Sequence, residues 1–300
     1  QESSDQLIIN SCICPTGELV AKLNNLKNGQ VLFNNDHWVG LKTSKPDWKA
    51  IEEQKFNGLD MVKCDDDPII IEQPWHIFRQ NGRAIREDFA LVTKGRTSAG
   101  ITDPHTKVYG EENIFIEEDV EIKAAVINAS DGPVYLGKNS MIHEGALIKG
   151  PLALCEGAHI NMGAKMRGDN TIGPYSKVGG EVSNSVIFGY SNKAHAGFLG
   201  NSVLGEWCNI GADTNTSNLK NNYTSIKLWN YARERFIDTG LQFCGLMMGD
   251  HSKAGINTMF NTGTVVGVGA NIFGDGFPRT FIPSFAWGGA SGFSTFKLSK

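Results

Sequence analysis

Aliphatic side chains recur at every sixth position along the middle of this 300-residue chain, and a second series with the same spacing lies nearer its end. An amphipathic helix places apolar residues about 3.6 positions apart and a half-buried strand about 2 apart, so neither element explains six. A period that persists over many repeats is typical of a solenoid, in which each repeat buries its face against the next. The two series are Leu136, Ile142, Ile148, Leu154, Ile160, Met166, Ile172 and Val178, then Met248, Ala254, Phe260, Val266 and Ile272.

The six-residue period predicts a parallel β-helix, an all-β fold whose short strands form flat faces and send one aliphatic side chain each into the coil. Glycine often follows the inward position, as Gly137 follows Leu136 and Gly173 follows Ile172. We expect these glycines at the corners, where a residue without a Cβ atom is conformationally permissive. The period alone does not fix the handedness of the coil.

Residues 1–100 lack this period, and their pattern alternates between short apolar runs and segments with helical spacing. Strands are expected at 7–9, 31–33, 38–41 and 69–71, and helices at 18–26 and 75–89. The chain is therefore predicted to contain a mixed α/β domain over 1–100 and a β-helix over 101–300, connected by the polar stretch 93–102.

The period disappears again between residues 213 and 245, a stretch rich in Asn and Thr and then in aromatic and charged residues. A long insertion out of a solenoid usually projects from one face and carries binding function. We therefore expect a binding insertion near 213–245.

The composition is that of a globular protein, with 40% hydrophobic and 20% charged residues. The net charge of −4 argues against nucleic acid as a partner, and no apolar run approaches the about 18 residues of a membrane span. None of the six cysteines has the C-x-x-C spacing of a metal site, so we expect reduced thiols, no bound metal and a cytoplasmic location. Because the chain begins without Met, we suspect a fragment of a longer protein.

One segment carries a recognisable chemical pattern. His195 is followed by Phe198-Leu199-Gly200, then by Asn209-Ile210-Gly211-Ala212-Asp213-Thr214, and finally by Asn218. This order and spacing resemble the acetyltransferase half of the GlmU-like bifunctional bacterial family, which joins a glucosamine-1-phosphate acetyltransferase to an N-acetylglucosamine-1-phosphate uridylyltransferase. Residues 162–167 resemble the family's basic phosphate-binding turn, and residues 178–209 resemble a GlmU-like group from Bacteroidetes whose nucleotidyltransferase domain looks incomplete.

The resemblance implies a left-handed β-helix, a homotrimer, and acetyl transfer from acetyl-CoA to an amino-sugar phosphate during synthesis of UDP-N-acetylglucosamine, a cell-wall precursor. It assigns His195 as general base, a role for which a side chain titrating near pH 7 is suited. The backbone N–H of Ala212 would stabilise the oxyanion, and Asn209 would orient the sugar or the base.

The remaining site residues are also implied by the resemblance. Arg167 and Lys165 would hold the sugar phosphate, for which a guanidinium fork is well shaped. Further substrate contacts are expected from Phe198, Asn218 and Lys193, and cofactor contacts from Ala212, Thr214 and Gly255.

The chain departs from the family pattern at three positions. Phe198 replaces a tyrosine, and the family's two lysines fall near Ser185 and Thr224. Lys220 or Arg233 of the insertion could compensate for the lost charge.

Other readings stay open. Arg167 could instead form a structural ion pair with Asp169, and Asn209 could form a side-chain ladder between coils. The whole protein could be a sugar-1-phosphate nucleotidylyltransferase completed by a missing N-terminal segment, with Mg²⁺ required only if that domain is complete. It could also be a non-catalytic trimeric scaffold that binds sugar nucleotides. A zinc carbonic anhydrase is disfavoured because the histidines lack the required pair on one coil edge.

Overall fold

The computed structural model describes residues 5–297, and the chain divides into two compact units, Gln1–His76 and Ile77–Lys300. The first unit is built on a four-stranded sheet in the order β1-β4-β3-β5, in which only the β3–β5 pair is parallel. Leu19 and Leu23 of a short helix bury in one core with Leu32 and Val39 of the sheet. The elements are β1 (Gln6–Ile9), β2 (Ile13–Cys14), α1 (Gly17–Asn24), β3 (Gln30–Asn34), β4 (His37–Thr43), α2 (Trp48–Glu52), β5 (Asp60–Cys64) and β6 (Ile69–Ile70).

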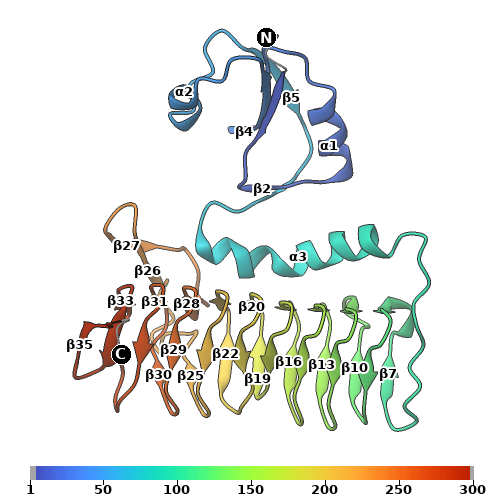
Figure 1. Ribbon diagram of the computed structural model, residues 1–300, viewed down its shortest axis with the longest axis vertical. Coiled ribbons are helices and arrows are strands. Elements are labelled where there is room, and N and C mark those ends of the chain that lie inside the picture. Colours follow the sequence, from blue (N-terminus) through green and yellow to red (C-terminus); the bar gives the residue numbers. More distant parts are fainter. Residues whose placement is uncertain (1–4, 298–300) are drawn as a thin grey trace. The chain divides into compact units, whose positions relative to one another are not determined.

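Helix α3 (Pro74–Thr93) crosses the division between the units, and from Ile77 onward it runs along the solenoid (Figure 1). Asn81 attaches it there: its Nδ2 donates to the carbonyl of Asp169 at 2.8 Å, and its Oδ1 accepts from the Thr171 hydroxyl at 2.7 Å. The compact units thus divide at residue 76, whereas the sequence placed a domain boundary near residue 100, because these polar contacts join the helix to the coils.

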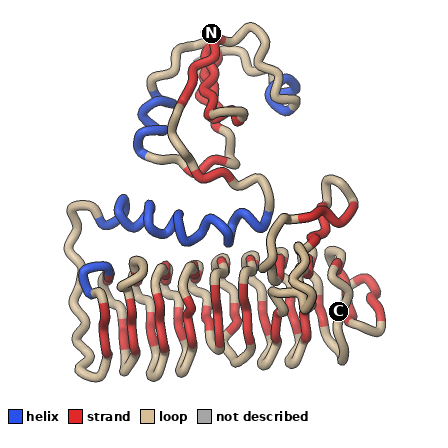
Figure 2. Tube along the Cα trace, turned by 180° about the vertical axis from the view of Figure 1, so that it is seen from behind, coloured by secondary structure: helices blue, strands red, loops and turns tan. Residues whose placement is uncertain are grey.

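The second unit is a solenoid of parallel strands on three faces, stacked coil upon coil (Figure 2). Face 1 contains β7 (Lys107–Tyr109), β10 (Val126–Asn128), β13 (Leu147–Lys149), β16 (Lys165–Arg167), β19 (Glu181–Ser183) and β22 (Phe198–Gly200), and the pair β25 (Asn215–Thr216) and β30 (Met259–Phe260) lies in later coils. Face 2 contains β8 (Ile114–Ile116), β11 (Val134–Leu136), β14 (Leu152–Leu154), β17 (Asn170–Ile172), β20 (Val186–Ile187), β23 (Val203–Leu204), β28 (Leu246–Met248), β31 (Thr264–Val266) and β33 (Phe281–Ile282).

Face 3 contains β9 (Glu121–Ile122), β12 (Met141–Ile142), β15 (His159–Ile160), β18 (Lys177–Val178), β21 (Asn192–Lys193), β24 (Asn209–Ile210), β29 (Lys253–Ala254), β32 (Asn271–Ile272), β34 (Ala286–Gly289) and β35 (Gly292–Thr295), of which the last pairs antiparallel. A short 3₁₀ helix, η1 (Glu111–Asn113), precedes β8. The predicted fold class, a mixed α/β domain followed by a left-handed parallel β-helix, is confirmed. Within residues 5–297, no helix has both the length and the apolar character needed to cross a bilayer.

Every member of the two six-residue series is buried, and together they form the core of the solenoid. The prediction that the glycines after the inward positions form the corners of the coil is wrong. A Cβ atom on Gly173 would lie 2.6 Å from the carbonyl carbon of Phe188, so this glycine permits close approach of the next coil. The left-handed corner is occupied two residues later by Tyr175, with φ of 57°.

The left-handed corners between faces 2 and 3 carry a ladder of stacked rings. Tyr175, Tyr190, Trp207 and His251 lie one above another, with successive centroids 5.5, 4.7 and 6.2 Å apart and planes within 11° of parallel. All four residues have φ between 57° and 60°. Stacking therefore accompanies a backbone conformation that is costly for residues other than glycine.

The predicted insertion leaves the solenoid after β25 and returns at β28. It contains an antiparallel hairpin of β26 (Lys227–Asn230) and β27 (Arg235–Asp238), and a bridge between Leu219 and Phe243 closes its base. Val203 pairs with Met247 across it, so the coils on either side remain in register.

Candidate functional site

His195 lies at an exposed corner between β21 and β22, in the turn 194–197. A Cβ atom on Gly179 would lie 2.1 Å from the Ala194 carbonyl oxygen, and one on Gly197 would lie 2.1 Å from that of Thr214. The turn is thus held closely between the coils before and after it, while the imidazole remains accessible to ligands.

Lys193, predicted to bind substrate, is inside the coil instead. It continues the inward column of face 3, where it pairs with Val178, and it is only 1% exposed. Its Nζ donates to the carbonyl oxygens of Gly179 and His195, both at 2.9 Å. Burial lowers the pKa of Lys193 to about 8, and the charge of Asp213 opposes this shift. The ammonium therefore binds backbone carbonyl oxygens inside the coil. This position corrects the prediction that Lys193 contacts the substrate.

Asn209 and Ala212 lie one coil beyond His195. Asn209 Oδ1 accepts from Nδ2 of Asn192 at 3.2 Å, so the side-chain ladder expected as an alternative is present. The carbonyl of Ala212 accepts from the N–H of Asn257 at 2.8 Å. Over residues 5–297, the N–H of Ala212 donates to no protein oxygen, which leaves it available for an oxyanion.

The two other residues predicted to bind cofactor behave differently. Thr214 is 1% exposed, and its hydroxyl donates to the carbonyl of Gly255 at 3.0 Å, so its side chain is engaged inside the coil. Gly255 is half-buried at the corner. A Cβ atom on Gly211 would lie 2.5 Å from the carbonyl carbon of Gly255, so the two coils are in close contact there.

The predicted phosphate-binding residues lie on the outer side of face 1. Lys165, Glu181 and Phe198 are register neighbours on three consecutive strands. Arg167 Nη1 lies 2.8 Å from Glu181 Oε1, so the alternative ion pair between Arg167 and Asp169 is not observed. Asp169 instead lies 3.8 Å from Arg86 of α3.

A cavity of about 480 Å³ lies along these strands. Lys149, which sequence reasoning missed, lines it together with Lys165, Arg167 and Glu181. Three cations and one carboxylate line this surface, which suits it to an anion, and Lys149 also pairs with Asp131 beside it at 2.7 Å. The spacing of 18 residues between Lys149 and Arg167, one full coil, was the available signal.

Phe198 and Asn218 meet above Gly200. A Cβ atom on Gly200 would lie 2.5 Å from Phe198 Cζ and 2.8 Å from Asn218 Nδ2. Asn218 Nδ2 also donates to Asn201 Oδ1 at 2.7 Å. The structure therefore brings these two predicted substrate residues together at the end of face 1, whereas Ser185, which stands near a family lysine, is completely buried.

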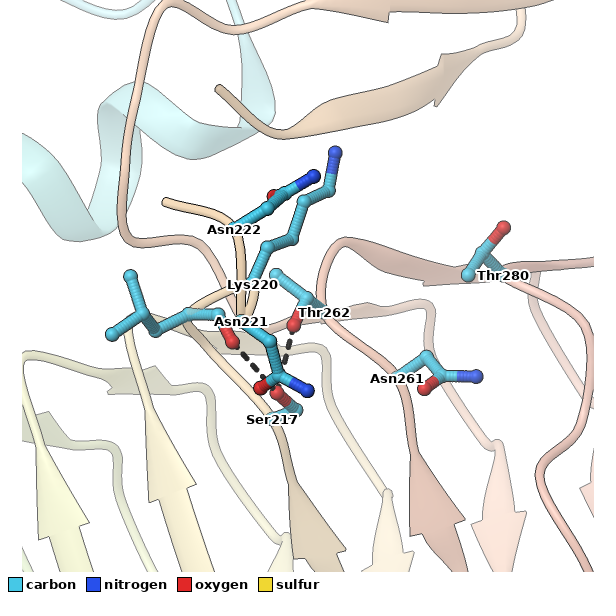
Figure 3. Close-up of a pocket in the computed structure, with 8 residues that line it drawn as sticks. Ser217, Lys220, Asn221, Asn222, Asn261, Thr262 and Thr280 are labelled. Atoms are coloured by element: carbon cyan, nitrogen blue, oxygen red, sulfur yellow. Dashed lines mark hydrogen bonds between the residues drawn. The ribbon is translucent and has the colours of Figure 1, made fainter. Parts of the chain in front are cut away.

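The base of the insertion contains a second cavity of about 460 Å³, lined mainly by residues with polar side chains (Figure 3). Ser217 and Thr262 face each other across its floor with their hydroxyl oxygens 2.7 Å apart. Its remaining lining residues are Leu219, Lys220, Asn221, Asn222, Asn261 and Thr280. Lys220 Nζ donates to the carbonyl of Ser225 at 2.9 Å, while Arg233 lies in the turn between β26 and β27 and does not line the cavity. The run of asparagines in the insertion was the sequence signal for this cavity.

The described cysteines are all free thiols. Burial raises the pKa of Cys208 to about 11 and that of Cys244 to about 12, which keeps both thiols protonated at neutral pH. Across residues 5–297, no three His, Cys, Asp or Glu side chains are grouped so as to hold a metal ion.

The chain is similar to a family model, to curated proteins and to solved structures. Residues 1–97 match the model of a family described as sugar nucleotidyl transferase. The chain is 30% identical over 217 residues to the bifunctional protein GlmU of Methanocaldococcus jannaschii, covering 72% of this chain and 45% of that relative. It is 30% identical over 205 residues to the bifunctional sugar-1-phosphate nucleotidylyltransferase/acetyltransferase of Sulfurisphaera tokodaii, covering 68% and 44% respectively.

The predicted resemblance to the GlmU-like bifunctional family is thus confirmed, and the narrower group from Bacteroidetes stays a prediction. The chain spans about half the length of the curated relatives it matches, since it covers 45% and 44% of them. Among solved structures, the polySia-specific acetyltransferase NeuO is similar with a TM-score of 0.34 at 13% identity, covering 66% of this chain and 86% of that chain.

Proposed function

We propose that this GlmU-related chain transfers the acetyl group of acetyl-CoA to the amine of an amino-sugar phosphate resembling glucosamine-1-phosphate. The observation that carries the proposal is the pairing of an exposed His195 on a tightly packed corner with a free Ala212 N–H one coil further on. The names of the curated relatives, which include an acetyltransferase, support the same reaction class.

In this mechanism the amine attacks the thioester carbonyl, and His195 accepts the proton that the amine loses. The Ala212 N–H donates to the oxyanion of the tetrahedral intermediate, where a fixed donor is more effective than mobile water. The C–S bond then breaks, and the proton held by His195 returns to the departing thiolate of CoA. Asn209 lies beside this path and would orient the acceptor.

The sugar phosphate would bind on face 1. Arg167, Lys165 and Lys149 supply positive charge there, and Phe198 and Asn218 form the end of the surface. Phe198 offers a ring face where the family has a hydroxyl, so we expect a sugar-stacking contact and one phosphate contact fewer. Acetyl-CoA would lie along the corners formed by Ala212 and Gly255. A homotrimer and a cytoplasmic location complete the proposal.

Release of free thiol from acetyl-CoA in the presence of glucosamine-1-phosphate tests the reaction. His195→Ala should lower kcat by about 10²- to 10⁴-fold, as expected for loss of a general base. His105→Ala, which removes an exposed histidine from the segment leading into the solenoid, is the matched control and should retain wild-type turnover. Equal rates in the wild type and His195→Ala would remove His195 from the mechanism.

A second candidate function is supported by the match of residues 1–97 to a sugar nucleotidyl transferase family. In that case the whole protein would form a nucleotide sugar from a sugar-1-phosphate and a nucleoside triphosphate with Mg²⁺. Pyrophosphate release that requires both the sugar phosphate and Mg²⁺ would support it. Tight binding of UDP-N-acetylglucosamine without release of thiol or pyrophosphate would instead support the alternative of a non-catalytic scaffold that binds sugar nucleotides.

A further inference from the structure

We infer that Lys193 is a positioning residue, whose buried ammonium ties the carbonyl oxygen of His195 to that of Gly179 and thereby fixes the orientation of His195 at the coil corner. This inference rests on the proposed role of His195 in acyl transfer. Lys193 does not contact the ligand-accessible surface, so it would act only through the histidine.

The position of Lys193 is unusual for a lysine. Strands of face 3 place an apolar residue at the same inward position in the coils before and after, Val178 and Ile210, and both are buried. A charge at this position loses its hydration, and two hydrogen bonds to carbonyl oxygens at 2.9 Å are its compensation. An aliphatic residue would satisfy the coil equally well, so stability alone does not explain a lysine here.

The turn that carries His195 is restrained at every carbonyl. Asn161 Nδ2 donates to Ala194 O at 3.0 Å, and Lys193 Nζ donates to His195 O at 2.9 Å. The backbone N–H groups of Asp213 and Glu181 donate to Ala196 O and Gly197 O at 3.1 and 3.2 Å. Of these four restraints, the one from Lys193 acts on the histidine itself.

The consequence for catalysis is geometric. A general base must be held within a fraction of an ångström of its productive position, and a misplacement of about 1 Å can cost about 100-fold in rate. We call the two hydrogen bonds from Lys193 Nζ to the Gly179 and His195 carbonyl oxygens the clamp. Without the clamp, the turn at His195 could rotate while the coil stays folded. The loss should therefore fall on kcat, while substrate contacts on face 1 and the KM of the sugar phosphate are retained.

Lys193→Met tests this inference because methionine has a similar length and suits an inward apolar position. The expected result is a kcat about 10- to 100-fold below wild type, with KM within about 2-fold and the thermal midpoint retained or raised. Lys177→Met removes an exposed lysine from the neighbouring strand of the same face and is the matched control. Wild-type kcat in Lys193→Met would overturn the inference.

A double-mutant cycle distinguishes positioning from a separate structural effect. If Lys193 acts through the histidine, Lys193→Met should cause no further loss of activity in a His195→Ala background. An additional loss of the same size as in the wild-type background would contradict the clamp.

Hydrogen exchange separates failure of this inference from failure of the proposed function, because it needs no turnover. Backbone amides of residues 194–200 should exchange at least about 10-fold faster in Lys193→Met, while residues 136–172 keep their wild-type rates. If the wild type proves inactive but this segment loosens, the acyl-transfer proposal fails and the clamp stands. Unchanged exchange at 194–200 would overturn the clamp.

Discussion

Arg167 and Glu181 form a salt bridge of 2.8 Å on the outer side of face 1, so the guanidinium proposed to bind phosphate is already paired with a carboxylate. Both side chains retain solvent contact, which makes the pair weak and its charge readily redirected to a ligand. Glu181 therefore limits how strongly this surface attracts an anion.

Glu181→Gln should strengthen binding of the sugar phosphate, because it removes the competing carboxylate and leaves Arg167 intact. We expect KM for the sugar phosphate to fall about 2- to 5-fold, the scale of an exposed ion pair, and the gain to shrink as ionic strength rises. Glu118→Gln, which breaks the exposed Lys138–Glu118 pair elsewhere, is the control and should leave KM unchanged. A higher KM in Glu181→Gln would mean that the carboxylate itself contacts the substrate.

The buried ammonium of Lys193 should make stability depend on alkaline pH. Its folded pKa is about 8, against an ordinary value of 10.5. Between these values the unfolded chain binds a proton that the folded chain has released, so the free energy of unfolding rises with pH. Relative to Lys193→Met, the wild type should gain about 3 kcal/mol between about pH 7.5 and about pH 10.5, measured by denaturant unfolding. A wild-type free energy of unfolding that, relative to Lys193→Met, stays constant or falls between these pH values would contradict a buried lysine.

Trp207 allows ring stacking and backbone strain to be separated. Its ring stacks on Tyr190 and His251, and its backbone has φ of 60°. Trp207→Ala and Trp207→Gly lose the same ring, but only alanine keeps the left-handed penalty of about 1 kcal/mol or more. The glycine variant should therefore unfold at a higher urea concentration than the alanine variant. The opposite order would show that the corner relaxes when the ring is removed.

Asn81 should be important for the attachment of helix α3. Asn81→Ala leaves the Asp169 carbonyl and the Thr171 hydroxyl without their partner, which should cost about 1–3 kcal/mol. Hydrogen exchange of residues 77–93 should accelerate accordingly. Glu87→Gln, which alters only the exposed pair with Arg83, should change stability by less than about 0.5 kcal/mol. Equal exchange rates at residues 77–93 in the wild type, Asn81→Ala and Glu87→Gln would show that Asn81 does not attach the helix to the coils.

Much of the solenoid could be predicted because its core repeats one geometric requirement. Residues such as Leu136 and Ile160 occupy equivalent inward positions, so burial imposes the same chemistry at a constant spacing. The turn that carries His195 was also identifiable, since its spacing follows a known family pattern. Most N-terminal elements were predicted from local apolar runs and turns, although β2, α2 and β5 were missed.

The inward position of Lys193 could not be predicted, because the coil length changes just before it. Leu154 pairs with Ile172 eighteen residues later, but Ile172 pairs with Ile187 after fifteen, and Val178 with Lys193 after fifteen. The shorter coil shifts the six-residue phase, so a lysine reaches the interior without a sequence signal. The partnership of Arg167 with Glu181 escaped prediction for the same reason, since it depends on which residues of adjacent coils face each other.

The insertion closed by Leu219 and Phe243 has an evolutionary consequence. Because Val203 and Met247 pair across it as neighbours, the coils that hold the proposed catalytic residues stay in register whatever the insertion's length or composition. Substitutions at Lys220, Asn221 and Asn222 can then change which molecules the asparagine-rich cavity admits, while the corner that carries His195 keeps its position. Relatives that share the coils but differ in residues 219–222 are therefore where a change in the ligand of this second cavity should be sought.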